Sequence, residues 1–362
     1  MAYTTIDDPS AYFQTALYTG NSSTNVITND GNSDLQADWI WLKERSSTSS
    51  HHVFDSSRGI GDSGKALIVN GNDAEGDDTA FRSFDSDGFT LANTGGFNES
   101  GVTNVAWQWK ANGGTTASNS DGSITSTVQA DTTAGFSIVT YTGTGSTATV
   151  GHGLGVKPSV IIIKARTEPT GGVHFGSDQG NWIVYHQGTA SDPETDLLLL
   201  NENNAVQDST GHMNDTAPTT SVFTIHTNVD VNESSDTYVA YCFAEKQGYS
   251  KFGRYTGNGN ADGPFVYTGF KPAWIMIKRT DAANSWYLVD STRGSTNVIS
   301  AELEANNNGA EATSNVRLDI LSNGYKIRTS GAAYNASSGT YIYAAFAEHP
   351  FVSSKGVPTT AR

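Results

Sequence analysis

The chain has 362 residues, of which 16% are charged, and its 37 acidic against 21 basic side chains give a formal charge of −16. Such a chain repels phosphate backbones and anionic headgroups, which argues against nucleic-acid or membrane-surface binding. Its longest aliphatic runs, Val160–Ile163 and Leu197–Leu200, fall far short of the ~20 residues that span a bilayer. The first residues do not resemble a signal peptide, and a single Cys excludes intrachain disulfides, as is typical of a protein made in a reducing cytosol.

One pattern is repeated three times along the chain. Each copy begins with Tyr-Thr-Gly, at residues 18–20, 141–143 and 255–257. Each then continues into an apolar strand that ends in Lys, at residues 39–43, 160–164 and 274–278. Each copy closes on an Asn before an aromatic strand, namely Asn98, Asn232 and Asn335. The Tyr-to-Asn separations are 80, 91 and 80 residues, so the sequence predicts one fold used three times. The extra length of the second copy is expected within residues 167–180 or 201–220, where surface loops absorb it.

The segments between these landmarks are typical of β-strands. They are short, β-branched or aromatic, and bounded by Gly, Asn, Asp, Ser and Pro. Asp-Gly and Asn-Gly pairs within Phe84–Phe89 and Leu321–Tyr325 predict two tight hairpins in which both central residues have positive φ. The predicted fold class is therefore all-β, with three tandem antiparallel β-sandwich domains of one jelly-roll-like type.

Repeat positions set the predicted domain boundaries. We expect a first sandwich with an N-terminal arm at residues 1–110 and a linker with one short strand at 111–134. The second sandwich is expected at residues 135–248, the third at 249–350, and a C-terminal tail at 351–362. The short join at residues 245–251 predicts that the second and third domains are held close together.

Two matching Asp-x-x-Arg turns are the most specific candidates for a ligand site. They place Asp55 with Arg58 and Asp290 with Arg293, whereas the second copy has His186 at the corresponding place. An Arg three residues after an Asp can fold back on that carboxylate, and such a pair can bind a sugar or an ion. The alternative interpretation is a salt-bridged structural turn.

Other chemistry-bearing residues favour structural interpretations. The eight His residues lack the spacing of metal ligands, and no metal or other cofactor is predicted. Asp85 and Asp87 resemble half of a calcium loop but fit a hairpin turn better, and the acidic stretch 73–78 is expected to be solvated. Cys242 lies within a predicted strand, which favours a packed thiol over a nucleophile. No catalytic residue is predicted, because the Glu residues that offer a carboxylate pair resemble strand ends.

Several segments of the sequence are similar to segments of a known protein family. They lie at residues 105–114, 119–128, 134–146 and 150–158, and through the repeats the similarity extends from residue 84 to about 350. The chain thereby resembles a repeated β-sandwich domain of unknown function, found in tail-fibre-like or structural virion proteins of marine tailed bacteriophages. The resemblance brings no catalytic residues with it.

The resemblance implies a non-enzymatic virion protein, made in the host cytoplasm. The expected role is a tail-fibre or appendage component that presents β-sandwiches for adsorption to the host surface. Its expected partners are other virion proteins, further copies of itself, as in a trimeric fibre, and host surface glycans. A capsid decoration, cement or adaptor protein without receptor binding is the alternative, and a polysaccharide depolymerase is a weaker one.

Charge differs between the repeats. Residues 1–110 hold 15 acidic and 6 basic side chains, residues 111–248 hold 14 and 4, and residues 249–362 hold 8 and 11. The net charges are therefore −9, −10 and +3. This asymmetry predicts that the third domain docks on an acidic neighbour through Arg293, Arg317 and Arg328.

Overall fold

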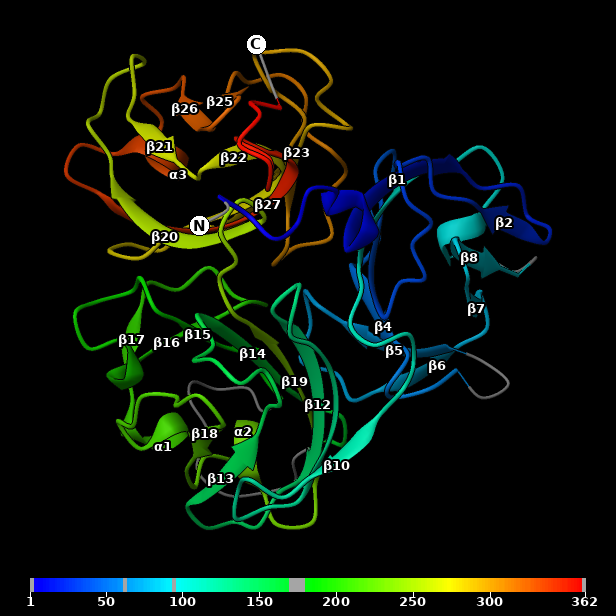
Figure 1. The fold of residues 1–362 in the computed structure, drawn as a ribbon, viewed down its shortest axis with the longest axis vertical. Helices are drawn as coiled ribbons and strands as arrows, with labels where there is room; N and C mark the ends of the chain where they lie inside the picture. Colours follow the sequence, from blue (N-terminus) through cyan, green and yellow to red (C-terminus); the bar gives the residue numbers. More distant parts are fainter. Residues whose placement is uncertain (1–2, 61–63, 93–95, 169–179, 360–362) are drawn as a thin grey trace.

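The computed structural model describes residues 3–60, 64–92, 96–168 and 180–359. Its regular secondary structure is mostly antiparallel β-sheet, grouped into three sandwiches, one for each copy of the sequence pattern, which confirms the predicted fold class. In Figure 1 the three sandwiches surround a common centre, each beside the other two.

The first sandwich pairs a six-stranded sheet with a three-stranded one. The large sheet has the order β1 (Phe13–Thr19), β9 (Thr103–Trp109), β3 (Trp39–Glu44), β4 (His52–Asp55), β5 (Gly64–Ile68) and β6 (Gly76–Asp78). The small sheet has the order β2 (Asn25–Ile27), β8 (Gly88–Leu91) and β7 (Phe81–Asp85). Two 3-10 turns, η1 (Pro9–Ala11) and η2 (Gly96–Asn98), flank these strands.

The second sandwich has the largest sheet. Its eight strands run in the order β10 (Ala117–Asn119), β11 (Ser126–Asp131), β12 (Phe136–Thr142), β19 (Thr237–Phe243), β14 (Val160–Ala165), β15 (Ile183–His186), β16 (Asp196–Leu199) and β17 (Gln207–Asp208). The opposing sheet pairs β13 (Ala148–Gly151) with β18 (Val222–Ile225). Three short helices, η3 (Pro193–Thr195), α1 (Thr210–Met213) and α2 (Val229–Asn232), lie in the connections.

The third sandwich repeats the plan of the first with fewer strands. One sheet has the order β20 (Ser250–Thr256), β27 (Thr340–Pro350), β22 (Phe270–Arg279), β23 (Trp286–Asp290) and β24 (Leu303–Glu304). The other has the order β21 (Phe265–Tyr267), β26 (Gly324–Ile327) and β25 (Leu318–Leu321), and α3 (Ala332–Asn335) precedes β27.

Two intervals differ from the sequence-based picture or extend beyond it. Residues 111–134, predicted as a linker with one short strand, contain β10 and β11, which extend the second sandwich's large sheet beyond β12. Of the two intervals proposed for the extra length, 201–220 contains β17 and α1. Most of the interval 167–180 lies outside the described residues.

The repeated Gly and Asn form a lock inside each sandwich. In the second repeat, Asn232 is fully buried, and its Oδ1 accepts from the backbone N of Thr144, which follows Tyr-Thr-Gly143, at 2.8 Å. A Cβ on Gly143 would overlap the carbonyl oxygen of Glu233, so only Gly allows this close approach. Asn98 and Asn335 make the same bond to Asn21 and Asn258, at 3.1 and 2.7 Å.

Both predicted hairpins are confirmed, but their turns begin one residue earlier than expected. Asp85 pairs with Gly88, and Leu321 pairs with Gly324, so each glycine starts the returning strand. The central residues of the observed turns, at 86–87 and 322–323, do not have positive φ, whereas Gly88 does, at 102°. Glycine is required there because a Cβ would overlap the carbonyl oxygen of Ile27 or of Val266 on the neighbouring strand.

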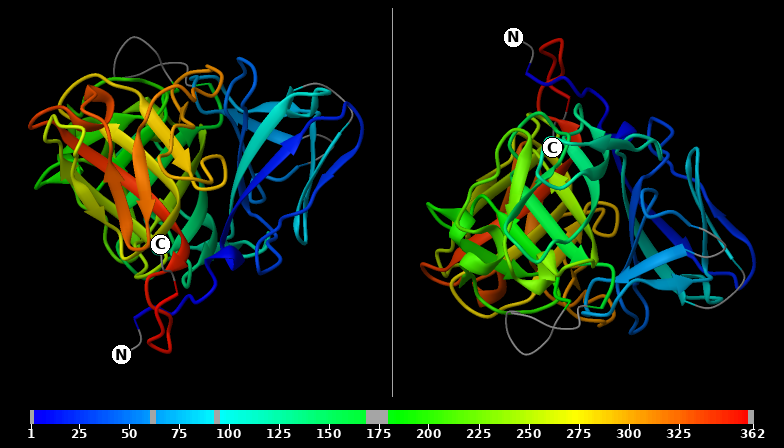
Figure 2. Two further views of the ribbon diagram at one scale, coloured as in Figure 1. Left: turned by 90° about the horizontal axis from the view of Figure 1, so that it is seen from above. Right: turned by 90° about the horizontal axis from the view of Figure 1, so that it is seen from below.

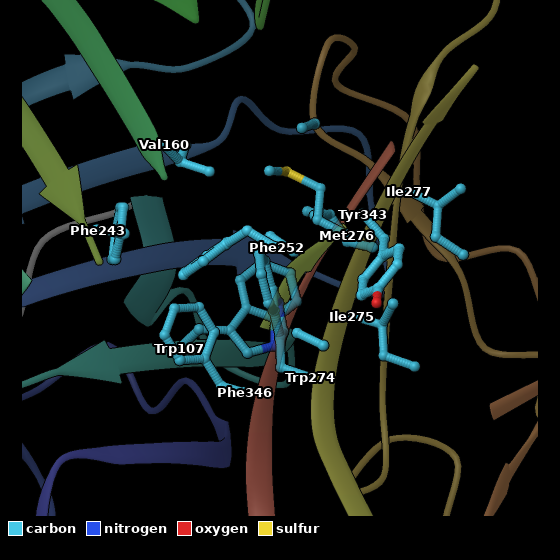
Figure 3. Close-up of a cluster of buried hydrophobic side chains, with 14 of the residues drawn as sticks. Trp107, Val160, Phe243, Phe252, Trp274, Ile275, Met276, Ile277, Tyr343 and Phe346 are labelled. Carbon is cyan, nitrogen blue, oxygen red and sulfur yellow. The ribbon is translucent and has the colours of Figure 1, made fainter. Parts of the chain in front are cut away.

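The large sheets bury their aromatic faces on one another at the centre of the molecule. Figure 3 shows part of this cluster, in which side chains from all three repeats meet. Trp109 of the first repeat lies 5.4 Å from Trp274 of the third, and Phe346 of the third lies 5.8 Å from Phe243 of the second, between ring centroids. Separate apolar clusters fill the interiors of the first two sandwiches. The repeats therefore share one core, and each central face is closed by the other two repeats.

The described segments next to the two chain ends project together from one side of this assembly (Figure 2). The N-terminal arm reaches the third repeat, where the Tyr3 hydroxyl donates to the Gly269 carbonyl at 2.7 Å. Asp7 accepts from the backbone N of Ser354 at 2.6 Å. The first repeat is thus connected to the third both by its sheet and by its arm.

Candidate functional site: three joints and one open cleft

The predicted Asp-x-x-Arg pairs fold back as expected, but they lie inside the molecule. Arg58 Nε is 2.5 Å from Asp55 Oδ2, and both side chains are fully buried. Arg293 and Asp290 repeat this geometry, again at 2.5 Å and without side-chain exposure. Each Asp ends a strand, β4 or β23, so the turn that follows points its Arg back along that strand.

Each carboxylate also accepts from an aromatic side chain of another repeat. The Tyr241 hydroxyl donates to Asp55 Oδ2 at 2.7 Å, and Trp107 Nε1 donates to Asp290 Oδ2 at 3.0 Å. We call the contact of the second repeat with the first repeat the first joint. The contact of the first repeat with the third repeat is the third joint. The contact of the third repeat on the second is the second joint.

Acidic residues extend both ion pairs across the joints. At the first joint Glu75 binds Arg58 and Arg166, each at 2.9 Å. Burial raises the pKa of the Glu75 carboxyl, but the bonds to Arg166 and Arg58 outweigh this and hold the pKa below its usual range. At the third joint Glu311 takes the same place between Arg293, at 3.0 Å, and Arg45, at 2.8 Å.

A buried lysine crosses every joint. Lys164 Nζ donates to the Asn72 carbonyl at 3.3 Å, Lys278 to that of Asn203 at 3.2 Å, and Lys43 to that of Asn308 at 3.4 Å. Burial lowers the pKa of all three to about 8. The three contacts are equivalent and form a closed cycle, so the repeats are arranged like the subunits of a cyclic trimer.

The second joint uses different side chains at the same positions. His186 replaces the Asp, and its Nε2 donates to the Tyr343 carbonyl at 3.0 Å while its Nδ1 accepts from Gly188 N at 2.9 Å. Burial lowers the pKa of His186 to about 4, so the ring is neutral at neutral pH. At this position a neutral imidazole therefore replaces the charged Asp–Arg pair of the other two joints.

These positions correct the ligand-site interpretation. Asp55, Arg58, Asp290 and Arg293 are inaccessible, and their polar atoms already bind within the chain, so they hold the repeats together rather than a ligand. Arg293 is likewise excluded as a docking residue.

The other two docking candidates lie nearer the surface. Arg317 is mostly buried and paired with Glu302 at 2.7 Å, while the Arg328 side chain is 43% exposed beside Asp319. Docking through Arg317 and Arg328 stays a prediction.

Sequence reasoning missed Glu75 and the buried lysines. Glu75 lies in the acidic stretch that was expected to be solvated, and nothing local distinguishes it from its exposed neighbours. The lysines did carry a signal, because a basic residue ends the equivalent strand in every copy.

The remaining predicted positions have structural surroundings. Asp85 accepts from Ser83 and Thr90, each at 2.6 Å, within its hairpin. Cys242 is buried, and burial raises the pKa of its thiol, as a packed thiol requires. Among the described residues, no three His, Cys, Asp or Glu side chains are grouped as metal ligands would be.

An open cleft of about 440 Å³ lies at the third joint. Its lining comes from the start of β1, the loop at residues 30–32, the ends of β22 and β27, and the turn after β23. Most lining side chains are polar, namely Ser10, Gln14, Thr15, Asp30, Asn32, Lys271, Ser291, Thr292, Ser295, Glu348 and His349. Lys271 and Glu348 form an ion pair at its edge.

Comparison with known proteins places the whole three-repeat unit in one family. Within the described part of the chain, no helix is long and apolar enough to cross a bilayer. No curated protein matches the sequence. Residues 8–350, which include all three sandwiches and all three joints, match a family described as a domain of unknown function, DUF7483. The chain therefore belongs to the DUF7483 family, and its match to the family spans all three repeats.

Proposed function

We propose that the chain is a non-enzymatic structural protein of a bacteriophage virion, a tail-fibre or appendage component that presents its sandwiches for adsorption to the host surface. The closed set of three joints is the observation that supports this proposal most directly. Its charged side chains are used to hold three equivalent sandwiches around one core. This is the construction of a rigid scaffold.

The threefold arrangement also suits the proposed location. Fibres and appendages are commonly built on rotational symmetry, and closed symmetry fixes which surfaces of a subunit remain outward. One chain of this kind offers three similar outer surfaces around a single axis. The proposed partners are other virion proteins, further copies of the chain, and host surface glycans.

Locating the chain on the particle tests this proposal. Virions of the phage that encodes it would be purified, analysed by mass spectrometry, and labelled with gold-coupled antibody against the purified protein. We expect the chain in intact particles, with label on the tail or its appendages. Label over the capsid would instead support a decoration protein, and absence from purified particles would overturn the virion assignment.

Adsorption is tested separately with the purified protein on a glycan array. Binding to defined surface glycans, and competition by the protein for phage attachment, are the expected results. A blank array together with unchanged attachment would remove the receptor-binding part and leave a scaffold.

A further inference from the structure

We propose that the cleft at the third joint is a strand-binding slot, which takes an extended segment of a partner polypeptide along the free edge of β1, with a glutamine side chain opposite Thr15. The inference does not depend on the virion role, because it is drawn from a comparison of the three joints within this chain.

The first joint shows what fills the equivalent place. Strand β12 of the second repeat is equivalent to β1 of the first, and β11 runs antiparallel along its outer edge. Within that pairing Gln129 stands opposite Ile138. The β11 strand therefore occupies the space between the second repeat and the turn after β4.

Gln129 joins that strand to the first repeat. Its Nε2 donates to the hydroxyls of Ser56 at 2.9 Å and Ser57 at 2.8 Å, and its Oε1 accepts from Gly114 N at 2.7 Å. Gln129 is completely buried. An amide fits this place because it donates and accepts at once.

The second joint also places a glutamine on the equivalent edge. Gln187 follows His186 in the turn after β15, and its Nε2 donates to the Phe252 carbonyl on β20 at 2.8 Å. The edge of β12 is thus covered by a whole strand, and the edge of β20 accepts one glutamine side chain.

The third joint has the same receiving groups, but no glutamine is recorded bonding to them. The one glutamine that lines the cleft, Gln14, uses its amide on backbone groups of Ser10, Gly31 and Ser33 instead. Ser291 and Thr292 follow Asp290 as Ser56 and Ser57 follow Asp55, and both line the cleft. On the opposite side lies Thr15, the equivalent of Ile138. Strand β1 ends its sheet and is paired with β9, and its outer edge has no partner strand among the described residues.

Two polar atoms at the cleft support an absent partner. Thr15 is 9% exposed, yet its hydroxyl has no hydrogen-bond partner, and the buried Glu348 Oε2 is also unpaired. Buried polar groups of this kind normally bind something. The cleft volume of about 440 Å³ is within the ~300–1,000 Å³ that is usual for ligand sites.

A peptide is favoured over a sugar as the ligand, because the equivalent edge, that of β12, already binds a polypeptide strand, β11. Addition of a strand to a sheet edge takes affinity from main-chain hydrogen bonds and specificity from alternate side chains. The matching side chain at the first joint is Gln129, with Thr127 and Asp131 on the same face of the strand. A partner strand with this alternating polar pattern fits the cleft.

The test uses the full chain and a fluorescent peptide that copies residues 124–133, with fluorescence anisotropy to measure binding and hydrogen exchange to locate it. We expect saturable binding that slows exchange of the β1 amides. A peptide with Gln129→Leu is expected to bind at least about tenfold more weakly, because it covers the hydroxyls of Ser291 and Thr292 without bonding to them. A chain carrying S291A and T292V is expected to lose the same preference for glutamine while its melting temperature stays unchanged.

Three results would overturn the proposal. One is the absence of saturable peptide binding up to about 1 mM, the weakest affinity of interest. Another is equal binding of the glutamine and leucine peptides. The last is that simple saccharides, and not the peptide, slow hydrogen exchange of the amides around the cleft. Each can occur whether or not the chain is found on a virion, so failure here is separate from failure of the proposed function.

Discussion

At the scale of single residues, the buried Asp290–Arg293 pair carries the clearest energetic prediction. Both side chains are withdrawn from water, so removal of one leaves an uncompensated buried charge. Asp290→Ala is expected to lower the free energy of unfolding by about 3–5 kcal/mol. Urea denaturation followed by tryptophan fluorescence measures this loss. Trp107 reports on the site, because Arg293 lies over its ring, 5.2 Å from the ring centroid.

The Lys65–Asp77 pair supplies the matched control. Asp77 is 60% exposed, and exposed pairs contribute about 0–1 kcal/mol, so Asp77→Ala should leave the denaturation curve almost unchanged. Equal losses in the two variants would contradict the structural role given to the buried pair.

The three joint lysines predict a stability gain at alkaline pH. In the folded protein their pKa values are about 8, against an unfolded value of 10.5. Between these values the unfolded chain binds more protons than the folded one, so stability rises with pH across this window. We expect higher urea midpoints at about pH 9.5 than at about pH 7.5.

Substitution of one lysine identifies the source of that gain. Substitution of the buried Lys164 in Lys164→Met should reduce the rise between the two pH values, whereas Lys157→Met, at an exposed position, should not. The comparison stays below pH 10 because burial raises the pKa of tyrosines such as Tyr185 and Tyr238, which has the opposite effect at higher pH. An identical pH response in wild type and Lys164→Met would refute the lysine explanation.

At the scale of elements, the glycine after each hairpin turn acts through the neighbouring strand. A Cβ at Gly324 would overlap the Val266 carbonyl of β21, so Gly324→Ala should displace that strand and cost about 1–3 kcal/mol in thermal or urea unfolding.

Gly76→Ala is the matched control, because β6 leaves open space around that position. It should be neutral or slightly stabilising, by about 0.4–1 kcal/mol. A neutral Gly324→Ala would mean that β21 moves away from the added methyl group without cost.

The sequence predicts these elements well because their causes are local. The repeated Tyr-Thr-Gly and the closing Asn232 form one lock inside one sandwich, so their pattern is visible in the chain. Lys164 and Glu75 are different, because their burial depends on a neighbouring repeat that local periodicity does not describe. Asp55 and Arg58 show the same limit of local sequence patterns. Their spacing predicts that they pair, but it does not predict that another repeat covers them.

At the scale of the whole molecule, the shared core predicts one unfolding transition. Trp39 of the first repeat lies 4.7 Å from Tyr241 of the second, between ring centroids, and Trp107 binds the third repeat. A sandwich on its own would therefore expose its central aromatic face, even where it has an apolar interior of its own. Hydrogen exchange and tryptophan fluorescence should therefore report the same urea midpoint in all three repeats.

A variant at the centre extends this test. Trp39→Ala should lower the midpoint of every repeat together, by an amount typical of a large core truncation, about 3–5 kcal/mol. Separate midpoints for the three repeats, or a loss confined to the first, would show that the sandwiches are independent.

The order in which the joints close has a consequence for synthesis. The first joint needs only the first two repeats, but the third also needs Asp290 and Glu311, which leave the ribosome far later. Until then the nascent chain exposes the aromatic face around Trp107 and Trp109 to solvent. At about 5–20 residues per second this exposure lasts for seconds, when a chaperone or a neighbouring nascent chain can bind that face before the third repeat arrives.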